Sequence, residues 1–185
     1  MSSARSFFVG LLVGVVIIVP AGAYLFARLG GIPMATTADP LPLEERFAKI
    51  ALHASMGEAG KVQNPLEPTE ANMTAGAQIY VDNCAGCHGS PGQPKTRIAS
   101  GEFPPPPQLF EPRQMVTHDP QGITQWKIAH GIRLSGMPGF GNTLTATEQW
   151  QVTLMLAHAD KLPAAANDEL MKAGAKNTPF AADAR

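Results

Sequence analysis

The strongest constraint on this chain is residues 7–27 (FFVGLLVGVVIIVPAGAYLFA), a run of 21 residues without a charged side chain. About 20 apolar residues span the hydrocarbon core of a bilayer as a helix, so this run is long enough to cross a membrane. Arg5 and Arg28 flank the run. Pro20 would break a helix in water, but membrane helices tolerate proline. The run therefore predicts a transmembrane anchor over residues 1–28.

A cleaved signal peptide is the alternative interpretation of this run. Arg5 would supply its charged region, residues 7–19 its apolar region and residues 21–23 (AGA) a small-residue cleavage site. The apolar character continues through residues 24–26 (YLF), beyond that site, which favours a retained anchor. Gly10 and Gly14 form a G-x-x-x-G pattern that would let a second helix approach, in a homodimer or a larger complex, although glycines are common in membrane helices.

The rest of the chain divides by composition. Residues 29–68 read as a linker rich in Gly, Pro, Ala and Thr, with a short amphipathic helix over residues 43–56. Residues 69–163 read as a compact domain, and residues 164–185 as a mobile tail without a clear apolar face. The net charge of −1 lacks the basic excess expected of a nucleic-acid-binding protein.

The compact domain has a helical pattern. A first helix is expected over residues 70–83 with Thr69 as its N-cap, and a second over residues 121–129. A third is expected over residues 146–160, introduced by a capping box between Thr145 and Glu148. The Gly- and Pro-rich stretch between the first two helices is long for so small a domain unless it wraps around something. A domain of this size usually needs help from a metal, a disulfide or a cofactor.

Both cysteines of the chain fall in the pentapeptide CAGCH, where Cys84 and Cys87 are followed directly by His88. On one helical turn the two thiols lie on the same side, so each can form a thioether to one vinyl group, while the imidazole reaches the iron. C-x-x-C-H is the attachment signature of c-type haem, and we expect one covalent haem c here. A thioredoxin-like redox pair lacks its βαβ context, a zinc site lacks further ligands at suitable spacing, and a simple disulfide remains open.

The second axial position has several candidates. Met137 stands in Gly-Met-Pro-Gly, where Pro138 stiffens the loop and the flanking glycines allow a close approach to a porphyrin. His130, His118 and an open position are the alternatives. A His/Met pair raises the reduction potential and leaves no easy vacancy for a substrate, which suits electron transfer. Trp126 either donates its indole N–H to a haem propionate or packs as an ordinary core residue.

With these motifs, residues 69–163 resemble a class I mono-haem cytochrome c, and the full chain resembles a membrane-anchored member of that family. The resemblance implies an all-α, cytochrome c-like domain around the haem. Gly76 and Tyr80 match the first helix of the family, and Trp150 and Leu154 the last, where the two helices cross.

The family also places a proline carbonyl after the haem motif, where it accepts the N–H of the proximal imidazole, with a leucine packed on the ring. Pro106, Pro107 and Leu109 resemble this element, and the sequence leaves open which proline serves.

We therefore expect an electron-transfer protein and not an enzyme, tethered to the inner membrane with its haem domain in the periplasm. Its redox partners would be an oxidase, a quinol-oxidising complex or a dehydrogenase. One alternative is a fixed cytochrome c subunit of a larger respiratory or dehydrogenase complex. Another is a haem-based sensor with a displaceable sixth ligand.

Overall fold

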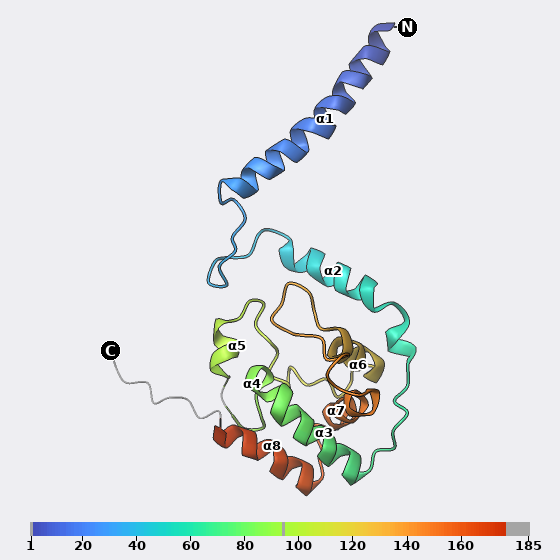
Figure 1. The fold of residues 1–185 in the computed structure, drawn as a ribbon, viewed down its shortest axis with the longest axis vertical. Coiled ribbons are helices and arrows are strands. Elements are labelled where there is room, and N and C mark those ends of the chain that lie inside the picture. Colours follow the sequence, from blue (N-terminus) through green and yellow to red (C-terminus); the bar gives the residue numbers. More distant parts are fainter. Residues whose placement is uncertain (1, 94, 177–185) are drawn as a thin grey trace, which may run out of the picture. The chain divides into compact units, whose positions relative to one another are not determined.

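The structure, a computed structural model, describes residues 2–93 and 95–176. Over these residues the fold is all-helical, without a β-strand, as the sequence predicts (Figure 1). Two compact units divide between Arg46 and Phe47. The helices in chain order are α1 (Ser2–Arg28), α2 (Glu44–Met56), η1 (Gly57–Lys61), α3 (Glu70–Asn83), α4 (Ala85–His88), α5 (Arg97–Gly101), α6 (Gln121–His130), α7 (Ala146–Ala157) and α8 (Ala164–Lys176).

α1 is the predicted long apolar helix. The 25 residues Ala4–Arg28 are long and apolar enough to cross a membrane, and Pro20 lies inside the helix. Large apolar side chains are exposed on all its sides, including Phe8, Val13 and Ile18. A helix that is apolar all round fits a lipid environment. A signal sequence has the same length and composition, so the retention of α1 stays a prediction, as does the role of its two glycines.

α3 and α7 form the centre of the second unit, and the predicted crossing is present. A Cβ on Gly76 would lie 2.6 Å from the carbonyl carbon of Gln151 and 3.0 Å from Cβ of Met155, so the helices approach at backbone distance. Tyr80 and Leu154 are buried beside the crossing, as is Trp150. Only glycine allows so close an approach of two helices.

Side-chain caps begin both helices as predicted. The Thr69 hydroxyl accepts a hydrogen bond from the backbone N–H of Asn72 at the start of α3. At the start of α7, Thr145 and Glu148 form the reciprocal capping box. The backbone N–H of Thr145 donates to the Glu148 carboxylate over 2.7 Å. These bonds satisfy N–H groups that the helix leaves without partners and so define where each helix begins.

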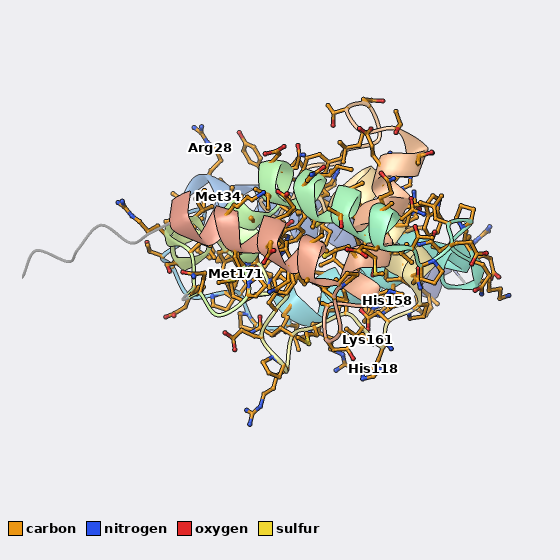
Figure 2. The ribbon with its side chains drawn as sticks, turned by 90° about the horizontal axis from the view of Figure 1, so that it is seen from below. Arg28, Met34, His118, His158, Lys161 and Met171 are labelled. Atoms are coloured by element: carbon orange, nitrogen blue, oxygen red, sulfur yellow. The ribbon has the colours of Figure 1, made fainter. Side chains whose placement is uncertain are left out.

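The expectation of a mobile tail from residue 164 is wrong for the part that the structure describes. Residues Ala164–Lys176 form α8, which packs along α3, and Figure 2 shows the two helices side by side. Ala166 and Leu170, one turn apart, are fully buried. Residues 177–185 lie outside the described residues. The sequence did not predict this helix because its two buried side chains form only a narrow apolar stripe.

The segment before α3 also belongs to the second unit, although the sequence suggested a linker up to residue 68. η1 packs on α6, where a Cβ on Gly122 would lie 2.8 Å from the carbonyl oxygen of Val62. The Asn64 side chain donates to the side-chain oxygen of Gln121 over 2.8 Å and to the carbonyl of Trp150 over 3.3 Å. Residues 57–66 therefore pack on α6 and α7 and do not form a free linker.

Candidate haem site

The two cysteines are brought together by the turn of α4. Cys84 ends α3, and its carbonyl accepts hydrogen bonds from the backbone N–H groups of Cys87 at 3.1 Å and His88 at 2.9 Å. The two cysteines are not bonded to each other. Residues three apart on a helical turn are neighbours on its surface, so both thiols lie on one side. This is the spacing that two thioether bonds to one porphyrin need.

Burial favours the protonated form of both thiols. Burial raises the pKa of the Cys84 thiol to about 12, with a smaller contribution from Cys87. Burial also raises the pKa of Cys87, and the carboxylate of Glu102 adds to the effect. A thioredoxin-like redox pair uses a reactive thiolate, which burial of these thiols disfavours. Across the described residues, moreover, no group of three or more His, Cys, Asp and Glu side chains could hold a metal ion.

His88 is oriented by a backbone carbonyl. Its Nδ1 lies 2.8 Å from the carbonyl oxygen of Pro107. Because a carbonyl only accepts, Nδ1 must carry the proton and donate, which leaves Nε2 with its lone pair for a metal. Burial lowers the pKa of His88, while the bond to Pro107 and the charge of Glu102 oppose that shift. The neutral imidazole is the form that binds iron.

The residues around Pro107 hold it at this position. The backbone N–H of Leu109 donates to the carbonyl of His88 over 3.1 Å, and the Leu109 side chain is part of the buried core. The Gln108 amide donates to the carbonyls of Cys87 at 3.0 Å and Pro106 at 3.1 Å. The structure thus favours Pro107 over Pro106 as the partner of the histidine, a choice that the sequence left open.

Met137 lies in a loop that is pinned to the end of α6. The backbone N–H of Ile132 donates to the carbonyl of Met137 over 3.1 Å. Gly131, with φ of 68°, is pressed against the loop, and a Cβ there would lie 2.7 Å from the carbonyl oxygen of Met137. Gly139 similarly touches the backbone of His130. Met137 is half-buried in this loop, which has the rigidity that a weak thioether ligand requires.

Glu102 links the Met137 loop to the CAGCH motif. A Cβ on Gly136 would lie 3.2 Å from Cγ of Glu102 and closer still to its carboxylate, so this side chain lies directly on the loop. The same carboxylate acts electrostatically on Cys87 and His88. Its Oε2 is buried and has no hydrogen-bond partner. The sequence analysis missed Glu102; the available signal was that it is the single acidic residue between residues 84 and 110.

The other candidate residues lie at the periphery. His130 is exposed, its Nδ1 donates to the carbonyl of Trp126 over 2.9 Å, and its ring stacks on the indole at 4.6 Å. Trp126 is half-buried in that stack, and its proposed contact with a propionate stays a prediction. His118 is exposed and lies at the outer edge of the domain (Figure 2).

The residues of this site fit a covalent haem. Two cysteines that are not bonded to each other lie one turn apart, an imidazole presents Nε2, and glycines let two backbone segments approach closely. A small helical domain that crosses α3 over α7 and ends its first helix in such a motif has the arrangement expected of a c-type cytochrome domain.

Comparison with known families agrees with this class. Residues 71–154 match the family model described as Cytochrome C oxidase, cbb3-type, subunit III, over less than half of the chain. No curated protein and no solved structure gives a significant match. The matched segment supports a mono-haem c-type cytochrome domain and haem-based electron transfer. The apolar helix α1 fits membrane anchoring of this domain.

Proposed function

We propose that this chain is a membrane-tethered electron carrier whose haem domain faces the periplasm of the inner membrane. One haem c is held by thioether bonds from Cys84 and Cys87, with His88 and Met137 as axial ligands. The observation that carries this proposal is the 2.8 Å bond from His88 Nδ1 to Pro107, beside two unpaired thiols. That bond orients Nε2 for iron, which a histidine in a redox dithiol motif does not need.

The residues of the motif do the work of attachment and orientation. Cys84 and Cys87 would hold a haem by thioether bonds, each formed by addition of the thiol S–H across one vinyl group, which requires no oxidant or reductant. Pro107 keeps the proton on Nδ1 of His88, and Leu109 contributes to the apolar surroundings. The haem, when bound, supplies a one-electron couple between ferrous and ferric iron.

Met137 is supported as the second axial ligand by its loop. The hydrogen bond from Ile132 and the contact with Gly131 hold the backbone of the loop, so little chain entropy is lost when the sulfur binds. Glu102 joins this loop electrostatically and sterically to the motif that holds His88. His130 is less suited, because its ring is exposed and stacks on Trp126.

The tether fits the work of an electron carrier. Electron-transfer contacts are small and short-lived, so a carrier gains from a high effective concentration of its partners. A single helix such as α1 confines the haem domain near the membrane and near integral membrane enzymes. We propose an oxidase, a quinol-oxidising complex or a dehydrogenase as the redox partner.

A fixed subunit of an oxidase is the second candidate function, and the matched family favours it, since its description names a subunit of a cbb3-type cytochrome C oxidase. Gly10 and Gly14 would then pack against a neighbouring helix. Extraction in mild detergent separates the two candidates. A carrier migrates alone on a native gel, whereas a subunit co-purifies with partners in fixed stoichiometry.

The ligand assignment is tested by Met137→Ala with Met115→Ala as the control, because Met115 is another half-buried methionine in a loop. We expect Met137→Ala to keep its covalent haem, lower the reduction potential and bind carbon monoxide rapidly when reduced. Met115→Ala should behave as the wild type. Rapid carbon monoxide binding by the wild type would refute Met137 ligation and favour a sensor. If His130→Ala bound carbon monoxide rapidly and Met137→Ala did not, the sixth ligand would be His130.

A further inference from the structure

The helix α2 carries an apolar side that none of the described residues covers. Phe47 is 66% exposed and Ile50 57% exposed, and the small residues Ala51 and Ala54 beside them are exposed as well. The spacing of positions 47, 50, 51 and 54 places these four side chains on one side of the helix. We call these four residues the outer face of α2.

The opposite side of the same helix is already used. Leu52 is half-buried and Met56 is 6% exposed, so this side faces the protein. A helix that packs on its domain by one side normally presents polar residues on the other. The outer face of α2 breaks this rule with a phenylalanine and an isoleucine one turn apart, and an exposed apolar stripe of this kind indicates an interaction surface.

The distance along the chain to α1 limits what can cover this face. α1 ends at Arg28 and α2 begins at Glu44, so residues 29–43 alone join them. At about 3.4 Å per extended residue this connection spans at most about 50 Å. Several turns shorten it further, including those around residues 35–38. If α1 spans the bilayer, α2 stays permanently within reach of the lipid surface.

A basic side chain beside the outer face suits anionic lipid headgroups. Arg46 lies on the flank next to Ile50, four residues before it, whereas Lys49 lies seven residues before Met56 and so on the opposite side of the helix. Basic side chains at the border of an apolar stripe extend toward anionic headgroups while the stripe enters the acyl boundary. The acidic Glu44 is turned to its own chain, where its carboxylate accepts from the backbone N–H of Leu41 over 2.8 Å.

We propose that the outer face of α2 lies in the lipid–water interface and holds the haem domain in a fixed orientation on the membrane. This inference rests on the membrane tether of the proposed function and goes beyond it. A domain on a free linker would tumble, whereas one held at α1 and again at α2 presents a constant side to membrane partners.

The test uses the full-length haem protein in nanodiscs that contain anionic lipid. A spin label is attached at Ala54→Cys on the outer face. The matched control carries the label at Ala48→Cys, an exposed alanine of the same helix that lies about 120° around the helix axis from position 54. Labelled wild type reports any background from Cys84 and Cys87. We expect the label at position 54 to gain accessibility to oxygen and lose accessibility to a water-soluble nickel complex, relative to the label at position 48. Adding Phe47→Ser and Ile50→Ser should reverse this difference.

The outcomes separate this inference from the proposed function. If the protein co-elutes with nanodiscs while position 54 is as accessible to nickel as position 48, the inference is wrong and the membrane tether stands. Such a result would indicate that the outer face binds a protein partner and not lipid. If the full-length protein does not enter nanodiscs, both the tether and the inference fail.

Discussion

Replacing Gly76 with alanine tests the crossing on which the haem domain depends. The new Cβ would lie 2.6 Å from the carbonyl carbon of Gln151 and 3.0 Å from Cβ of Met155, well inside ordinary contact distances. The new Cβ would collide with backbone atoms of Gln151, which cannot rotate away as a side chain can. α3 and α7 must therefore move apart along their whole contact. Overpacking of this kind costs about 1–3 kcal/mol, and a backbone collision belongs at the upper end. The better helix propensity of alanine returns up to about 1 kcal/mol.

The net loss of stability should therefore be about 2 kcal/mol. For a domain of this size it corresponds to a melting temperature lower by about 10 °C. The measurement is thermal unfolding of the haem protein, followed by circular dichroism and by haem absorption. Gly101→Ala is the control, because that glycine has open space around its Cβ position. An unchanged melting temperature for Gly76→Ala would mean that the helices do not cross at this residue.

Three further substitutions probe single interactions around the site. Tyr80→Phe removes the buried 2.9 Å hydrogen bond from the phenol to the carbonyl of Gly89 and should cost about 1–3 kcal/mol in chemical denaturation, because the carbonyl loses its partner. Thr145→Ala should cost about 1 kcal/mol at neutral pH. The backbone N–H of Thr145 and, second, its hydroxyl donate to the Glu148 carboxylate and lower its pKa, and Thr145→Ala removes only the contribution of the hydroxyl. That contribution is complete above the ordinary value of 4.5 and is lost as the pH falls through the lowered value. The Thr145→Ala deficit should thus shrink in melts recorded at about pH 3, and a deficit constant with pH would contradict it. Glu102→Gln removes a negative charge beside the haem motif and should raise the reduction potential by about 40 mV, the equivalent of about 1 kcal/mol, in a redox titration; a lower potential would refute this placement of the charge.

Local signals in the sequence predicted the parts of the fold that depend on short-range chemistry. The Thr69 cap and the Thr145 box place the starts of α3 and α7, because both consist of hydrogen bonds within three residues. Gly76 was predicted at the crossing by family resemblance. The packing of α8 was not predicted, because its buried side consists of Ala166 and Leu170 alone.

Contacts between distant loops were beyond the reach of the sequence. Glu102 and Gly136 lie in separate irregular segments, and no periodicity relates the two positions. Their contact follows from how α5, α6 and the haem motif fold together, which only the three-dimensional structure contains. The buried Oε2 of Glu102 without a partner is the feature that draws attention to this side chain. A single acidic residue in a long Gly- and Pro-rich stretch is a weak signal by itself.

The choice between Pro106 and Pro107 shows how one side chain sets the register of the site. In an extended segment successive carbonyls point to opposite sides, so a shift of one residue would turn the wrong oxygen toward His88. Gln108 prevents this shift through two hydrogen bonds. Its side-chain amide donates to the carbonyl of Pro106 over 3.1 Å, and its backbone N–H donates to the side-chain oxygen of Gln114 over 2.7 Å. The carbonyl of Pro107 is thereby left for the imidazole. The tautomer of the proposed iron ligand thus depends on a glutamine that the sequence did not single out.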